Sequence, residues 1–359
     1  MSEIISHTAA LVQLCEQLRA HSVIGLDTEF MRERTYFAQL CLIQLSFAQR
    51  AVCIDTLKLR DLSALQPIMQ AREPLKVLHA ARQDLEVLEP ATGAVTGLFD
   101  TQVAAALIGM PAQVGYGELV EQLLSTKLRK AETRTDWSRR PLSSAQLTYA
   151  LDDVHYLLPL RARLRERLEQ LGRWHWFEEE MGELDASGSF AIDPQQAWRR
   201  VKGLGELDEP RERLARELAA WRERVAISAD RPRNWILPDA ALRDIVLQAP
   251  RTLEQLQALT TLPESLHGQS AALLELIEAA QLPARLAPLP SRGRPDPATI
   301  QAVKKLSQLT QLTGRELGIA PEILATRREM ERLVAGARDG GLLSGWRRAV
   351  IGERLLGAL

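Results

Sequence analysis

The amino-acid sequence predicts a mixed α/β domain followed by two all-helical modules. Short apolar runs of strand length alternate with helical patterns only in the first half of the chain. Strand signals vanish beyond about residue 170, and two turn-rich stretches, 182–194 and 288–295, are typical of linkers. We therefore expect domains at 1–175, 205–285 and 295–359, a division that suits a chain of 359 residues.

Four apolar runs in the first half have the length and composition of strands: 23–27, 40–45, 51–54 and 76–79. The connections between the first three are short enough for antiparallel pairing. The fourth run follows a helix-like stretch at 59–70, and the pattern from residue 81 onward is mainly helical, apart from a short strand at 97–99. This order predicts a mixed sheet flanked by helices.

The region 205–282 predicts a small helical bundle. Prolines at 232, 238, 250 and 263 mark helix boundaries. Six apolar side chains are spaced as its core: Trp221, Ile227, Trp235, Ile245, Leu253 and Leu256.

Composition predicts a globular cytoplasmic protein, with 46% hydrophobic and 25% charged residues. No run approaches the roughly 18 apolar residues that a membrane span needs. The first residues lack a basic start followed by an apolar core, so secretion is not expected. Three cysteines, Cys15, Cys41 and Cys53, predict buried free thiols rather than a disulfide frame. The formal charge of −1 indicates no partner by itself, and we expect a monomer.

Asp27 and Glu29 are the first candidates for chemistry. Residues two apart on a strand point to the same face, so these carboxylates project together. Two carboxylates that share a partly buried place repel each other unless a cation holds them. The pattern therefore predicts a site for Mg²⁺ or Mn²⁺, although a strand end that meets solvent would give the same two residues.

Two further signals come later in the chain. Asp84 lies where an apolar strand runs into a helix, a position that the helix dipole alone would favour. Helical periodicity between 146 and 156 groups Tyr149, Asp153 and Tyr156 opposite an apolar stripe. Because a solvent-facing side rarely collects two tyrosines around an acid, we expect this face to line a cleft.

Together these pieces resemble the DEDD superfamily of 3′→5′ exonucleases, in the subgroup whose third motif is Tyr-x-x-x-Asp. The local sequences LDTEF at 26–30, FDT at 99–101 and WSRRPL at 137–142 are similar to those of the ribonuclease D family. The stretches LAAWRERVA at 218–226 and RPRNWILPD at 231–239 resemble the helicase-and-RNase-D C-terminal (HRDC) domain. The last segment, with GWR at 345–347, resembles a second and more divergent HRDC-like module.

The resemblance implies a ribonuclease-H-like sheet and a 3′→5′ exoribonuclease that releases nucleoside 5′-monophosphates, with precursor-tRNA 3′ ends as substrates. It implies two divalent ions, Mg²⁺ or Mn²⁺, with Asp27 bridging both. Glu29 and Asp153 complete the ion that activates the attacking water, Asp84 holds the other ion, and Tyr149 orients the water.

Six side chains are predicted more loosely to contact the RNA: Arg32, Arg34, Lys127, Trp137, Arg139 and Arg140. Two other functions stay open. A DNA 3′→5′ exonuclease would use the same five catalytic residues, because the choice between RNA and DNA depends on contacts to the 2′-hydroxyl. A non-catalytic nucleic-acid-binding scaffold would retain the fold, but the complete carboxylate set argues against it.

Overall fold

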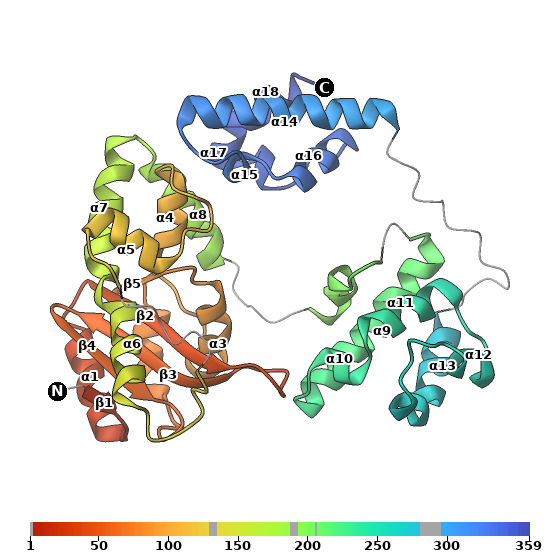
Figure 1. Ribbon diagram of the computed structural model, residues 1–359, viewed down its shortest axis with the longest axis horizontal. Helices are drawn as coiled ribbons and strands as arrows, with labels where there is room; N and C mark the ends of the chain where they lie inside the picture. Colours follow the sequence, from red (N-terminus) through yellow and green to blue (C-terminus); the bar gives the residue numbers. More distant parts are fainter. Residues whose placement is uncertain (1–2, 129–134, 187–192, 205–206, 281–295) are drawn as a thin grey trace. The chain divides into compact units, whose positions relative to one another are not determined.

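The computed structural model describes residues 3–128, 135–186, 193–204, 207–280 and 296–359 (Figure 1). The chain divides into two compact units. One, here called the sheet unit, comprises residues 1–31, 40–190 and 294–359; the other, the helical unit, comprises 32–39 and 191–293. The predicted linker 288–295 lies outside the described residues, and the linker 182–194 lies partly outside them.

The sheet unit contains a six-stranded mixed sheet with the order β1-β4-β3-β2-β5-β6. Its strands are β1 Glu3–Ile5, β2 Val23–Met31, β3 Gln39–Phe47, β4 Arg50–Asp55, β5 Leu75–Leu78 and β6 Leu98–Asp100. Strands β3 and β4 are antiparallel, whereas β2–β5, β5–β6 and β1–β4 are parallel. The sequence predicted every strand except β1. Because β2 and β5 run in the same direction, the residues at and beyond their carboxyl ends share one edge of the sheet.

The helices of this part of the chain are α1 Thr8–Leu18, α2 Gln66–Gln70, α3 Arg82–Thr92, α4 Thr101–Leu107, α5 Tyr116–Leu124, α6 Ser144–His155, α7 Leu157–Gln170 and α8 Trp174–Ala186. The predicted helix at 59–70 is shorter in the structure, where a 3₁₀ turn at Ser63–Leu65 leads into α2. Helix α1 packs its buried leucines into the core that also contains Ile24, Leu26, Ile43 and Leu45 of the sheet. The three cysteines are buried free thiols, as predicted.

The final segment is all-helical, as predicted, but it shares the core of the sheet unit. Its helices are α14 Pro297–Leu317, α15 Pro321–Leu324, α16 Arg327–Val334, α17 Gly345–Arg347 and α18 Glu353–Leu356. The ring of Trp346 stacks on that of Trp176 in α8, with centroids 4.6 Å apart. The Trp346 indole donates to Glu180 and its backbone amide donates to Glu179, both at 2.7 Å. The stacking of the two indoles and the satisfied N–H group of the Trp346 indole both stabilise this packing.

The helical unit contains α9 Glu209–Ala229, α10 Arg233–Ile236, α11 Asp239–Gln248, α12 Leu253–Gln257 and α13 Ser270–Ala279. Its core includes Ile245 and Leu256, as predicted. Trp235 and Leu253 were expected in that core, but both side chains are exposed, Trp235 to 57%. Among the described residues of both units, no helix combines the length and the apolar composition that crossing a bilayer requires.

Residues 32–39 belong to the helical unit by their contacts. The backbone amides of Tyr36 and Phe37 both donate to a carboxylate oxygen of Asp230 at 3.0 Å. The Tyr36 hydroxyl donates to Glu223 of α9, and the guanidinium of Arg233 lies over the Tyr36 ring. This short segment is therefore held against α9 and α10 by hydrogen bonds from its backbone and by contacts of the Tyr36 side chain.

Candidate active site

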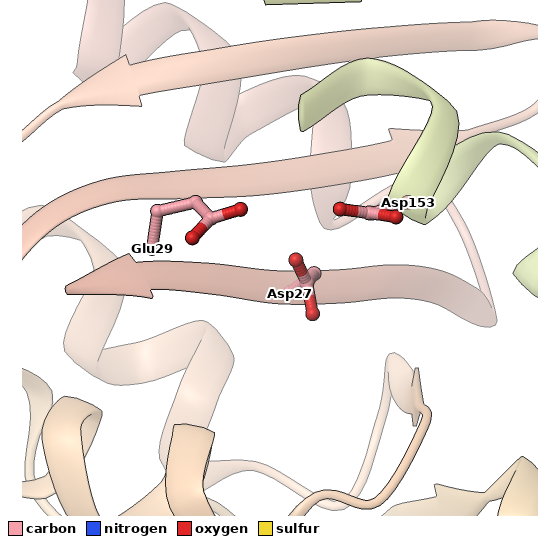
Figure 2. A group of neighbouring side chains, drawn as sticks. All are labelled: Asp27, Glu29 and Asp153. Carbon is pink, nitrogen blue, oxygen red and sulfur yellow. The ribbon is translucent and has the colours of Figure 1, made fainter. Parts of the chain in front are cut away.

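Strand β2 and helix α6 bring three acidic side chains together (Figure 2). Asp27 and Glu29 project from β2, and Asp153 projects from α6 toward them. One carboxylate oxygen from each of the three residues lies within 4.8 Å of the other two. The two-residue spacing on the strand produces the first half of this cluster, and packing of α6 on the sheet produces the second.

Small residues let α6 and α7 lie close to the sheet. A Cβ atom on Gly25 would lie 2.2 Å from the Ser46 hydroxyl oxygen and 3.3 Å from Leu157, so any larger residue at this position would push the helices away. The Ser46 hydroxyl donates to the carbonyl oxygen of Val154 at 2.7 Å. Because Val154 follows Asp153, this bond holds the acidic turn of α6 against the sheet.

Asp84 approaches the cluster from the first turn of α3. The carboxylate of Asp100 accepts from the amides of Ala80 and Ala81, at 3.1 and 2.8 Å, and so fixes the turn between β5 and α3. The Thr28 hydroxyl donates to Asp84 at 2.5 Å. Asp84 is not one of the three residues whose oxygens lie within 4.8 Å of one another, but its charge acts on Asp27, Glu29 and Asp153.

The carboxylates of the cluster resist ionisation. Burial, and then the charges of Asp84, Asp153 and Glu29, raise the pKa of Asp27 well above its usual value. Burial and the same kind of repulsion raise the pKa of Glu29 to about 8, that of Asp153 to about 7 and that of Asp84 to about 6. Desolvation and like-charge repulsion both raise these pKa values, and they outweigh the lowering effect of Thr28 on Asp84 and of Tyr149 on Asp153.

The donor set fits a hard divalent cation. Carboxylate oxygens are the ligands that Mg²⁺ and Mn²⁺ prefer, and a cation would remove the repulsion among them. Cys53, a soft donor close enough to interact with Asp27 and Glu29, has its pKa raised to about 12 by burial and by the charges of those two acids. A thiol that stays protonated is a poor ligand, so the site favours metals with oxygen ligands.

Tyr149 lies one helical turn before Asp153, and its phenol interacts with the Asp153 carboxylate closely enough to affect the pKa of both groups. Burial and the neighbouring acids raise the pKa of the phenol, which therefore stays protonated. Its ring stacks on that of Trp137, with centroids 6.0 Å apart and an interplanar angle of 29°. The structure thus brings together Tyr149 and Asp153 as the periodicity predicted.

Tyr116 supports the same helix and was not singled out in the sequence. Its hydroxyl donates to the Asp152 carbonyl at 3.1 Å and accepts from the Tyr156 amide at 3.2 Å. These bonds lie where α6 ends and α7 begins. Nothing in the sequence around α6 signals this role, because Tyr116 lies on α5. The role of Ser46 was missed for the same reason, since Ser46 lies on β3.

The side chains predicted to contact RNA lie in different environments. Lys127, Arg32 and Arg34 are exposed, although the two arginines lie in the segment grouped with the helical unit. The Arg139 side chain is 83% exposed and pairs with Asp136.

For the other two the structure corrects the prediction. Trp137 is only 6% exposed, because it packs under Tyr149. Arg140 is bonded inside the fold, to Asp55. Neither side chain is presented to a ligand.

Comparison with known proteins agrees with this geometry. A family model described as 3′-5′ exonuclease matches residues 2–169, and one described as HRDC domain matches 211–277. The ribonuclease D of Nitrobacter hamburgensis is 37% identical over 362 residues, covering 99% of this chain and 94% of that protein. The ribonuclease D of Pseudomonas paraeruginosa is 36% identical over 364 residues, covering 99% and 96%. The crystal structure of Escherichia coli RNase D, an exoribonuclease involved in structured RNA processing, matches with a TM-score of 0.88 at 34% identity, covering 100% of this chain and 98% of that one.

Proposed function

This chain belongs to the ribonuclease D family and is a 3′→5′ exoribonuclease, and on that premise we propose how its residues carry the reaction. We infer that it hydrolyses RNA from the 3′-hydroxyl end, using two divalent cations, Mg²⁺ or Mn²⁺, and releases nucleoside 5′-monophosphates. The observation that carries the proposal is the half-buried cluster of Asp27, Glu29 and Asp153, whose carboxylate oxygens lie within 4.8 Å of one another and whose pKa values are raised by burial and mutual repulsion.

The four acids have separate tasks in this proposal. Asp27 is central, since its pKa is raised by the charges of the three other acids, and it would bind both cations. Glu29 and Asp153 would hold one of them, and Asp84, fixed by its bond from Thr28, would hold the other. When bound, divalent cations lower the pKa of an attacking water and neutralise charge that develops on the phosphate.

Tyr149 positions the attacking water. Its phenol interacts with the Asp153 carboxylate, and the oxygen of a protonated phenol can accept a hydrogen bond from water. Because burial raises the pKa of the phenol, Tyr149 does not act as a base. Holding the water in line with the phosphate by such a bond is a contribution of orientation rather than of proton transfer.

For the substrate we propose structured RNA, in particular the 3′ ends of tRNA precursors. The HRDC domain supports this choice, as does the E. coli relative involved in structured RNA processing. Lys127, Arg139, Arg32 and Arg34 are the exposed cations that we assign to phosphate contacts. Precursor tRNAs are trimmed in the cytoplasm, where we place the enzyme, acting as a monomer.

Replacing single acids tests the assignment. Asp27→Asn and Asp153→Asn should each lower turnover of a labelled RNA oligomer by at least about 1000-fold, because each removes a ligand charge that the reaction needs. The matched control is Glu121→Gln, an exposed acid on α5. Thermal melting of all three variants should show a folded protein. Hydrolysis at the wild-type rate in either Asp variant, or in excess EDTA, would contradict the proposal.

Matched oligomers test the substrate. RNA with a free 3′-hydroxyl should be shortened to 5′-monophosphates, while DNA of the same sequence and RNA with a 3′-phosphate should persist. A tRNA precursor with a 3′ extension should then be compared with an unstructured RNA of equal length. Equal rates on RNA and DNA would favour a general exonuclease, and failure to trim the precursor would remove the proposed tRNA role.

A further inference from the structure

The guanidinium of Arg140 uses every one of its N–H donors inside the protein. Nε and Nη2 donate to the two carboxylate oxygens of Asp55, both at 2.8 Å. Nη1 donates to the carbonyl oxygens of Trp137 and Arg139, at 2.7 and 2.8 Å. Nη2 also donates to the carbonyl of Cys41 at 2.9 Å. An arginine has five N–H donors, so none is left for an RNA phosphate.

The pair of Asp55 and Arg140 joins three parts of the sheet unit. Asp55 is the last residue of β4, Cys41 lies on β3, and residues 137–140 form the connection that precedes α6. The Arg140 and Asp55 side chains are only 18% and 3% exposed. Burial alone would raise the pKa of Asp55, but the hydrogen bonds and charge of Arg140 hold it below its usual value. The pair is therefore an ionised, bidentate contact in a largely dry place.

Trp137 transmits this contact to the active site. Two of the five Arg140 bonds are to backbone carbonyl oxygens, those of Trp137 and Arg139. They therefore fix the backbone position from which the Trp137 side chain extends. The indole is buried in a small cluster with Cys41, Leu42, Cys53 and Ala150, and it stacks on Tyr149. Tyr149 in turn lies on α6 one helical turn before Asp153, and its phenol interacts with that carboxylate.

We propose that Asp55 and Arg140 are positioning residues that hold Trp137 against Tyr149 and so fix the direction of the Tyr149 phenol at the reacting centre. The inference rests on the proposed role of Tyr149. An apolar pair could fill the same space, often without loss of stability, but it could not hold the backbone of residues 137–139 by the two hydrogen bonds that Arg140 donates to it. Misplacement of an orienting group by about 1 Å lowers a rate by up to about 100-fold, which is the size of effect expected here.

The first test separates positioning from RNA binding. Arg140→Lys keeps the charge but loses the planar fork, and Asp55→Asn keeps the shape but loses the charge. Both should lower kcat by about 10- to 100-fold with KM nearly unchanged. The control is Arg163→Lys, an exposed arginine on α7 that pairs with Glu166, which should leave both constants unchanged. A rise in KM with unchanged kcat would show that Arg140 binds RNA and would overturn the proposal.

Loss of the ion pair could simply destabilise the fold, so a second variant removes that ambiguity. Asp55→Leu combined with Arg140→Met replaces the buried pair by apolar side chains of similar length, which is often neutral for stability. We expect a melting temperature near that of the wild type together with the same loss of kcat. Wild-type kcat in this double variant would overturn the proposal.

The second test asks whether the pair acts through Tyr149. In a Tyr149→Phe background, Arg140→Lys should cause little further loss of kcat, because both changes remove the same orientation. Losses that multiply would mean that Arg140 acts elsewhere, and the proposal would fail. If Tyr149→Phe alone has wild-type kcat, the role of Tyr149 in the proposed function is wrong, and this result is distinct from any result on Arg140.

A spectroscopic readout tests the positioning without catalysis. The chain has four tyrosines, so 3-fluorotyrosine labelling gives four ¹⁹F signals, and the one lost in Tyr149→Phe belongs to Tyr149. Arg140→Lys and Asp55→Asn should shift or broaden that signal. The signal of Tyr36, which is bonded to Glu223 in the helical unit, should stay in place. An unchanged Tyr149 signal would overturn the proposal whatever the kinetics show.

Discussion

Carboxylates that burial removes from water have pKa values shifted in opposite directions in the two units. In the helical unit, Glu223 is fully buried, but Arg233 donates two bonds to it, at 2.6 and 2.8 Å, and Tyr36 donates a third. Burial opposes its ionisation, yet these bonds hold the pKa of Glu223 below its usual value. In the sheet unit, burial and the charges of Asp153 and Asp84 all act against ionisation of Glu29, and its pKa rises to about 8.

The difference teaches how to distinguish a structural acid from a functional one. A buried acid that is paired with a cation from the same chain stabilises one arrangement of that chain. Buried acids that face only one another lower the stability of the fold, because their charges repel. Binding of a cation from solution removes this repulsion and makes the arrangement favourable. Perturbed pKa values of the second kind are typical of catalytic sites.

Among the variants that test this contrast between the units, the largest effect is expected for Glu29→Gln. Turnover should fall by about 100- to 1000-fold, since a ligand charge is lost. At pH 8 and in EDTA, however, the melting temperature should rise above that of the wild type, because one of the repelling charges is gone. Activity and thermal melts on the same samples check both parts; a lower melting temperature would show that Glu29 is paired in a way the structure does not reveal.

Glu223→Gln should give the reverse result. Loss of the charge leaves Arg233 without its partner, and unfolding of the helical unit should become easier by about 2–4 kcal/mol, less than for a wholly dry pair because Arg233 is 38% exposed. Cleavage of short unstructured RNA should keep its wild-type rate. Urea melts followed by intrinsic fluorescence, beside the oligomer assay, provide the measurement. Full stability in this variant would break the contrast between the units.

The pH dependence of stability should reveal the unpaired cluster. Folded pKa values of about 6, 7 and 8 for Asp84, Asp153 and Glu29 lie above the usual 3.8 to 4.5. Between these limits the folded protein binds more protons than the unfolded chain, so the free energy of unfolding falls as pH rises from about 4.5 to 8. Melts in EDTA should show this fall, and Mg²⁺ or Mn²⁺ should reduce it. A flat profile in EDTA would count against the cluster.

A buried cation, Lys76, should also make stability depend on pH, by a smaller amount and in the opposite direction. Its ammonium group donates to the carbonyls of Ala71 and Thr96, and burial lowers its pKa to about 8 although the charge of Asp185 opposes this. Between pH 8 and 10.5 the unfolded chain holds a proton that the folded protein has lost, so the free energy of unfolding should rise with pH in this window. Lys76→Met should remove that rise, and parallel pH profiles for the two proteins would refute it.

The acids of the candidate site could be singled out from local sequence patterns, and the structure brings three of them, Asp27, Glu29 and Asp153, together. The strand period places Asp27 and Glu29 on one face, and the helix period places Tyr149 beside Asp153. Asp84 follows from a strand that runs into a helix. None of these steps requires knowledge of a distant contact, and the ordered set then indicates that the pieces meet.

The features that sequence reasoning missed depend on distant partners. Arg140 was assigned to RNA, but its partner Asp55 lies 85 residues earlier in the chain. Strand β1 has only three residues, and it is defined by its pairing with β4. Trp235 was placed in a core because it is apolar, but a large apolar side chain is not always buried.

The division of the chain has a consequence for anyone who shortens this protein. Residue 186 belongs to the sheet unit and residue 193 to the helical unit; by residue 296 the chain is part of the sheet unit again, and Leu306 and Trp346 contribute to its hydrophobic core. A protease that nicks only one of these two crossings leaves the helical unit covalently attached by the other. A stop codon placed at the first crossing, in contrast, would strip core side chains from the nuclease itself, so the HRDC region is better removed by excising it and rejoining the ends.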